Sequence, residues 1–130
     1  MGAWGIGNFE NDDAADFVYD VEEDGVGAIR RAIEAAGTEH ADGYIEAPTA
    51  ACLIAAGEFM AVALGKPAPT LSEDVVAAAK RLAIQPEMVS KALPLLASIL
   101  EEGELKELWD ESGNAAEWRQ HVMTLIERLK

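Results

Sequence analysis

Apolar residues recur every three or four positions along most of the chain, a spacing that places them on one face of an α-helix. The first helix is expected to begin after Asn11, a residue that favours the cap position and is followed by two aspartates. A second helix is expected over residues 26–36, ending at Gly37, and the polar segment 38–46 is expected to be irregular. The apolar face of the first helix would comprise Ala14, Phe17, Val18 and Val21.

The middle of the chain is apolar on nearly every side of its predicted helix. Pro48 suits the first turn of a helix, and the apolar residues after it occupy both faces. A helix without a polar face is typical of the centre of a bundle, where every side is covered. One side would carry Leu53, Ile54, Gly57, Met60, Ala61 and Leu64, and the other Cys52, Ala55, Phe59 and Val62.

Four further helices are predicted after the glycine- and proline-rich stretch 65–69. Residues 70–73 match a capping box, and the helix that they open should end near Ile84. Pro86 suits the start of the next helix, which Pro94 should kink or split. A short helix should end at Ser112-Gly113, and Asn114 then caps the last one. The apolar positions of these last two helices are Leu105, Leu108 and Trp109, and Trp118, Val122, Leu125, Ile126 and Leu129.

Strand signals are weak, because no stretch alternates cleanly between apolar and polar residues. The 130 residues are close to the usual size of one domain, and no linker divides them. The sequence therefore predicts an all-α fold. We expect a single helical domain over residues 1–130, an irregular bundle of about six or seven helices around the central apolar helix.

Charge narrows the choice of partners. The chain has 24 acidic and 10 basic residues, a net charge of −14. Such a surface repels phosphate backbones and anionic lipid, so we expect neither nucleic acid nor a membrane as partner. It can attract a basic protein, although acidic residues also serve solubility alone.

Other features of the sequence indicate the cytoplasm. The single cysteine, Cys52, cannot form an internal disulfide, so an oxidising compartment is not required. The acidic N-terminal stretch does not resemble a signal peptide. The longest apolar run, 47–64, is interrupted by Glu58 and is short for a membrane span.

The glycine-rich start could cradle a phosphate, but no strand precedes its glycines. We expect it instead to be packed, with Trp4, Ile6 and Phe9 inserted into the core. The acids that follow could hold Mg²⁺ or Ca²⁺, although acids in a first helical turn are expected from the helix dipole alone. The candidate binding residues of this region are Trp4, Phe9, Asn11, Asp12, Asp13 and Asp16, together with Glu10 as a possible oxygen ligand.

The sequence gives little support for a catalytic site. Cys52 lies in an apolar run where a thiol stays protonated, and no signature joins it to His40 or His121. These three residues are too few for a structural zinc site. We therefore assign no catalytic residue, no metal site and no cofactor.

Three further candidates remain. Glu58 is the only charge between Glu46 and Lys66, and a buried carboxylate must be paired, hydrogen-bonded or protonated. It is either a functional acid in a cleft, or a carboxylate at the helix rim or paired with an arginine. Trp109 and Trp118, with Asp110 between them, fit helical core positions, but an exposed tryptophan there would be an interface anchor.

Several stretches of the chain resemble a bacterial family known only as domain of unknown function 4259. Its members begin with Met-Gly-Ala-Trp-Gly, a Phe and Asn-Asp-Asp, which here are residues 1–5, Phe9 and residues 11–13. The stretches 44–48 and 104–113, the run around Glu58, and Trp118-Arg119 are also similar. The resemblance implies a small cytoplasmic helical protein. It implies no activity and supplies no catalytic residues.

The leading hypothesis is a small acidic protein-interaction module, of the inhibitor or immunity type, that covers a basic protein. The first alternative is a small-molecule or metal-binding protein using the N-terminal acidic turn or Glu58, and an enzyme of unidentified class is the least favoured. A broad acidic face with an exposed aromatic residue would favour the leading hypothesis. Two acidic groups are the candidates: Asp12, Asp16, Asp20 and Glu23, and Glu101, Glu102, Glu104, Glu107, Asp110 and Glu111.

Overall fold

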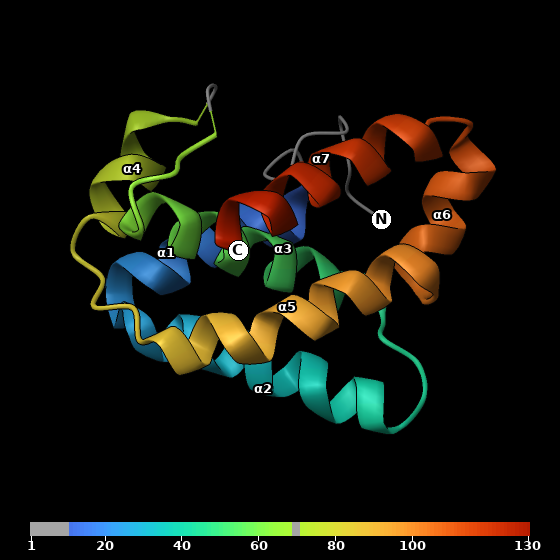
Figure 1. The fold of residues 1–130 in the computed structure, drawn as a ribbon, viewed down its shortest axis with the longest axis horizontal. Coiled ribbons are helices and arrows are strands. Elements are labelled where there is room, and N and C mark those ends of the chain that lie inside the picture. Colours follow the sequence, from blue (N-terminus) through green and yellow to red (C-terminus); the bar gives the residue numbers. More distant parts are fainter. Residues whose placement is uncertain (1–10, 69–70) are drawn as a thin grey trace.

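The computed structural model describes residues 11–68 and 71–130, and these contain seven α-helices and no β-strand. Figure 1 shows helices that cross at varied angles in an irregular bundle. The all-α prediction, with six or seven helices, is confirmed. The helices are α1 (Asp12–Asp24), α2 (Val26–Ala41), α3 (Ala47–Ala63), α4 (Glu73–Ala79), α5 (Pro86–Glu101), α6 (Glu104–Ser112) and α7 (Ala115–Leu129).

The apolar helix α3 lies at the centre, as predicted. Thirteen of its seventeen residues are buried, and it contacts each of the other six helices. Gly57 allows α7 to approach closely, since a Cβ atom there would lie 2.9 Å from Cδ2 of Leu125. On another side, Phe59 packs edge-on against Phe17 of α1, with ring centroids 6.1 Å apart. A helix that is apolar all round can be covered on every side only in such a position.

The start of α1 follows the sequence prediction. The side-chain oxygen of Asn11 accepts a hydrogen bond of 2.8 Å from the amide of Ala14. Asp12 and Asp13 occupy the first turn, where negative charge is favourable. The predicted apolar face of α1 points into the core, with Val18 at its half-buried edge.

The end of α2 differs from the prediction. Gly37 does not end the helix, which continues to Ala41, so the irregular segment is Asp42–Glu46 alone. A glycine inside a helix costs only about 1 kcal/mol relative to alanine, which tertiary contacts can offset. The added turn makes such contacts, because His40 Nδ1 lies 3.2 Å from Ser98 Oγ of α5.

The bounds of α4 were also predicted wrongly. The residue that caps it is Ser72, whose hydroxyl accepts from the amide of Val75 at 3.4 Å, and Thr70 lies outside the described residues. The helix ends at Ala79 and not near Ile84. Leu82 and Ile84 still pack against the core from the connection to α5, so their apolar spacing did not require a helix.

The last three helices lie where they were predicted. Pro94 does not split α5, which is continuous from Pro86 to Glu101. Pro94 is exposed, so solvent can reach the helix on the side where its ring removes a hydrogen bond. Gly113 ends α6 in the left-handed conformation, with φ of +86°. Asn114 occupies the cap position of α7, but its side chain makes no capping hydrogen bond within the described residues.

Candidate functional surface

The outward side of α1 is acidic and carries an exposed aromatic residue. Its acidic side chains, Asp12, Asp16, Asp20 and Glu23, are all exposed. Tyr19 is 67% exposed. It lies beside these acids, because it follows Asp16 by three residues and precedes Glu23 by four. We call Asp12, Asp16, Tyr19, Asp20 and Glu23 the α1 face. The tyrosine was not singled out from the sequence, where its helical spacing from the acids was the available signal.

The N-terminal candidates divide into two groups. Asn11, Asp12 and Asp13 form the cap and first turn of α1. In the part of the chain that the structure describes, no three His, Cys, Asp or Glu side chains form a group that could hold a metal ion. Trp4 and Phe9, with the glycine-rich start and Glu10, lie outside the described residues, so their packing stays a prediction.

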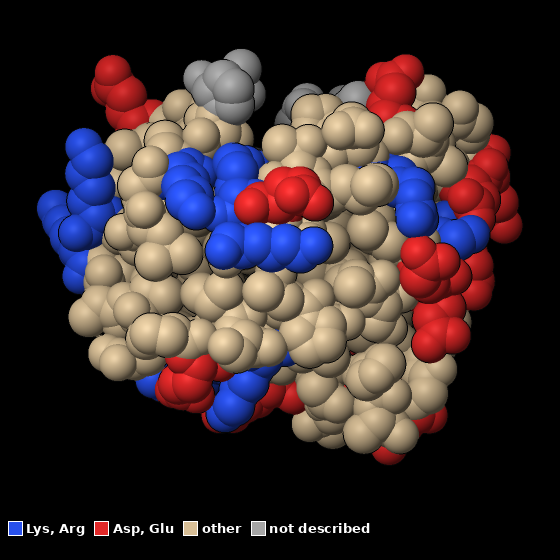
Figure 2. All heavy atoms as spheres, viewed as in Figure 1, with Lys and Arg blue, Asp and Glu red and all other residues tan. Residues whose placement is uncertain are grey.

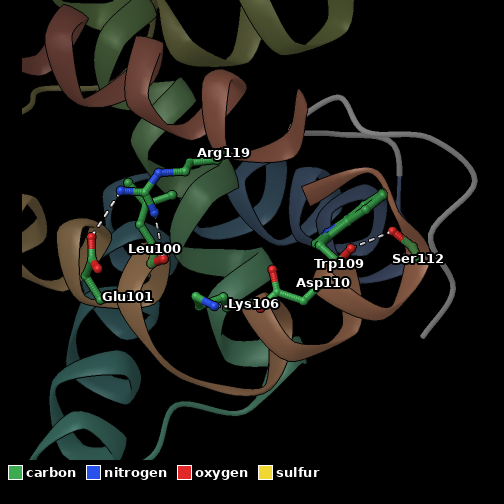
Figure 3. A network of polar contacts seen from close by, with 7 residues as sticks. All are labelled: Leu100, Glu101, Lys106, Trp109, Asp110, Ser112 and Arg119. Atoms are coloured by element: carbon green, nitrogen blue, oxygen red, sulfur yellow. Dashed lines mark hydrogen bonds and ion pairs between the residues drawn. The ribbon is translucent and has the colours of Figure 1, made fainter. Parts of the chain in front are cut away.

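The second acidic group is largely engaged in contacts within the protein. Arg119 donates to Glu101 at 3.1 Å and to the carbonyl of Leu100 at 2.9 Å, and Lys106 pairs with Asp110 (Figure 3). Ser112 closes the end of α6 by donating to the carbonyl of Trp109 at 2.7 Å (Figure 3). The contacts of Arg119 join α7 to the end of α5, and the pair of Lys106 with Asp110 lies within α6. Five of the six carboxylates in this group are exposed, but Glu101 and Asp110 are each paired with a cation.

Trp109 and Trp118 are both buried, with 9% and 4% of their surfaces exposed. They belong to the hydrophobic core, in α6 and α7. Neither presents the exposed ring that an interface anchor needs.

Glu58 is buried and paired with an arginine. Two hydrogen bonds of 2.8 Å join its carboxylate to the guanidinium of Arg128, which also donates to the carbonyl of Lys66 at 3.3 Å. Glu58 is 1% exposed. Of the two roles open to this residue, the structure therefore shows the arginine pair, which joins α3 to the last turn of α7.

Two stretches that carry the family resemblance, 44–48 and 104–113, lie against each other. The carboxylate of Glu104 accepts from the amide of Ala47 at 2.8 Å, and its own amide donates to the carbonyl of Ile45 at 3.1 Å. The hydroxyl of Tyr44 donates to Glu107 at 3.0 Å. These bonds fasten the connection before α3 to the first turn of α6.

The first amides of α3 are capped by carboxylates that are not adjacent to the helix start in sequence. Glu46 occupies the cap position without a side-chain capping bond, and Glu39 accepts from its amide at 2.8 Å. With Glu104 on Ala47, two carboxylates satisfy amides at the positive end of the central helix. Sequence reasoning missed this arrangement. The available signal was the absence of Ser, Thr, Asp or Asn directly before Ala47-Pro48.

Cys52 lies on α3 beneath α1 and is half-buried, with its sulfur 3.9 Å from the carbonyl oxygen of Asp13. Burial, followed by the negative charges of Asp13, Asp20 and Asp16, raises the pKa of its thiol to about 11. The thiol is therefore protonated and weakly reactive near neutral pH, as expected.

A pocket with a volume of about 270 Å³ opens beside Cys52, between α1, α2 and the start of α3. Phe17, Ala28 and Ala32 supply apolar wall, and Asp20 and Arg31 are its charged residues. His40 and His121 do not line it, so Cys52 has no histidine partner in this pocket.

Charge is distributed unevenly over the surface. Figure 2 shows one face on which Lys and Arg side chains lie in several groups and most Asp and Glu side chains lie toward the edges. The whole chain has 24 acidic and 10 basic residues. Figure 1, drawn from the same side, shows α1 passing behind α3.

None of the helices described is both long and apolar enough to cross a membrane. No curated protein and no solved structure matches this chain. One family model does match, Domain of unknown function (DUF4259), over residues 2–121. This match includes six whole helices and the first turns of α7, and it agrees with the resemblance found at the two ends and the middle of the sequence. The chain therefore belongs to the DUF4259 family.

Proposed function

We propose that this protein is an acidic protein-interaction module whose α1 face binds a basic protein surface. The observation that carries this proposal is the exposure of Tyr19 among the carboxylates of that face. Tyrosine supplies a large contact area at low entropic cost, and it is enriched among residues that dominate binding energy. Acidic residues kept for solubility alone do not require an aromatic ring at their centre.

The sign of the charge selects the class of partner. Asp16, Asp20 and Glu23 are exposed on one side of α1, and within residues 11–68 and 71–130 none of them forms an ion pair. They would repel a phosphate backbone or an anionic membrane, and they would steer a Lys- or Arg-rich surface toward Tyr19. A guanidinium or ammonium group can also stack on the ring of Tyr19. An inhibitor or immunity-type protein of the cytoplasm that covers a basic partner fits these features.

The test is a capture experiment with matched variants. The wild type and the double variant Asp16→Lys/Glu23→Lys are immobilised, exposed to lysate of cells that produce the protein, and eluted with a salt gradient. Glu34→Lys/Glu111→Lys is the control, because both glutamates are exposed and lie outside the α1 face. We expect a basic protein that the wild type and the control retain and the α1 variant does not.

Two further measurements sharpen this test. Tyr19→Ser should weaken the captured complex by about tenfold or more, the usual cost of removing an important aromatic contact. Association should slow as salt rises, because screening shortens the range of the steering charges. Tight binding of DNA or RNA at physiological salt, or equal capture by both charge variants, would contradict the proposal.

A further inference from the structure

The pocket beside Cys52 adjoins the α1 face. Asp20 belongs to both, since it is exposed on α1 and also lines the pocket. Phe17, three residues earlier on the same helix, forms an apolar wall of the pocket. A partner that covers the α1 face would therefore lie over the mouth of this pocket.

The walls of the pocket combine apolar surface with one acidic and one basic side chain. Ala28 and Ala32, one turn apart on α2, face Phe17 and Cys52 across it. Arg31 is the cation in the wall, and its guanidinium is already bound by Asp24 at 2.7 Å. The carboxylates of α1 thus set the sign of the charge at the pocket.

The same carboxylates act on the Cys52 thiol. Asp13, Asp20 and Asp16 all add to the rise in its pKa, after the larger effect of burial. Negative charge that disfavours a thiolate at Cys52 favours a cation beside it by the same interaction. The pocket is therefore suited to a group that is apolar along its length and positive at its end.

We propose that the pocket receives one lysine or arginine side chain of the basic partner, with its methylene stem on the apolar wall and its charged head at Asp20. Both side chains combine an apolar stem with a cationic end, which is the pattern that the pocket presents. This inference rests on the proposed function and makes it more specific, because it adds an anchor point to an electrostatic surface.

A small probe tests the pocket without the partner. Hexylammonium has the charge of a lysine side chain on a somewhat longer alkyl stem, and hexanoate has a similar stem with the opposite charge. We expect hexylammonium to shift the methyl signals of Ala28 and Ala32 in NMR spectra. Hexanoate should not shift them. No effect of hexylammonium, or an equal effect of hexanoate, would overturn the proposal.

A variant that fills the pocket separates this proposal from the broader one. Ala35 lines the pocket and is exposed, so Ala35→Leu narrows the pocket with little risk to the core. Ala97→Leu on α5 is the control, because Ala97 is also an exposed helical alanine and does not line the pocket. Ala35→Leu should weaken hexylammonium binding by roughly tenfold, a change of about 1.4 kcal/mol, while Ala97→Leu leaves it unchanged.

The captured partner completes the test. If the partner's affinity falls for Asp16→Lys/Glu23→Lys but not for Ala35→Leu, the α1 face binds the partner and the pocket proposal is wrong. If both variants weaken binding and Ala97→Leu does not, both proposals hold. If neither weakens it, both are wrong.

Discussion

Arg128 and Glu58 meet through two parallel hydrogen bonds of 2.8 Å, each from one guanidinium nitrogen to one carboxylate oxygen. The side chains are 17% and 2% exposed, so the pair is largely removed from water. Arg128→Met would leave a buried carboxylate without this partner, and we expect a loss of about 3–5 kcal/mol in the free energy of unfolding. Urea denaturation followed by circular dichroism measures it.

Two companion variants establish the cause of that loss. Arg128→Lys keeps the charge but not the planar fork, so it should lose less than Arg128→Met. Adding Glu58→Gln to Arg128→Met removes the buried carboxylate and should recover part of the stability. A double variant no more stable than Arg128→Met alone would show that lost packing, and not charge, accounts for the effect.

Gly103 and Gly113 form a matched pair, because both have positive φ and only one approaches other backbone. Gly103 has φ of +115° and ψ of +173°, and a Cβ there would lie 3.1 Å from the carbonyl oxygen of Ile45. Gly103→Ala should cost about 3 kcal/mol, at the upper end of the range for backbone strain. Gly113 has open space around it, so Gly113→Ala should cost about 1–2 kcal/mol. Equal losses of stability would mean that the contact with Ile45 adds nothing.

The raised pKa of Cys52 predicts slow alkylation. A shift from 9.0 to about 11 lowers the thiolate fraction near neutral pH about a hundredfold, and iodoacetamide should react correspondingly slowly. The rate should rise with pH until it passes about 11. Because the unfolded state loses this proton first, the thiol's contribution to stability should be lost as pH rises from about 9 to about 11.

The acids of α1 provide the control for this measurement. Asp16→Asn/Asp20→Asn should accelerate alkylation of Cys52 modestly, because burial remains the larger cause of the raised pKa. A wild-type rate equal to that of an exposed cysteine would show that the thiol is not protected.

Glu87 should titrate below the ordinary range of a glutamate. The hydrogen bond from Arg30, at 2.7 Å, and then that from Lys91 lower the pKa of Glu87. A lowered pKa in the folded state means that the link between α2 and α5 stabilises the fold above the ordinary pKa and is lost as pH falls through the lowered one. NMR titration of the Glu87 carboxyl carbon measures this. In Arg30→Gln/Lys91→Gln the pKa should return toward 4.5, and an unchanged titration would contradict the assigned cause.

Local chemistry explains which parts of the fold the sequence could predict. Asn11 caps α1 through an amide three residues away, and Gly113 ends α6 through its own backbone, so both signals are contained in a short stretch. The position of α3 was also predictable, because a helix without a polar face must be covered all round. Gly37 misled the prediction, since contacts such as that between His40 and Ser98 outweigh its low helix propensity.

The contacts of the other candidate residues were less predictable, because their partners are far apart in sequence. The side chain of Glu104 caps an amide 57 residues away, and Arg128 pairs with a carboxylate 70 residues away. Composition gave the excess of acid but not its placement. Several carboxylates of the 101–111 run bind neighbouring groups, and the acidic side chains of the α1 face lie around the exposed Tyr19.

The central position of α3 also determines how this protein can unfold. Since α3 contacts all six other helices, each of them uncovers part of the same apolar surface when it detaches. Partial opening is therefore costly wherever it begins, and unfolding should be cooperative across the whole bundle. The amide protons in the middle of α3, around Phe59 and Met60, can exchange with solvent only when that collective opening occurs. Their exchange rate thus reports the global stability of the bundle, while the ends of the outer helices report only local fraying.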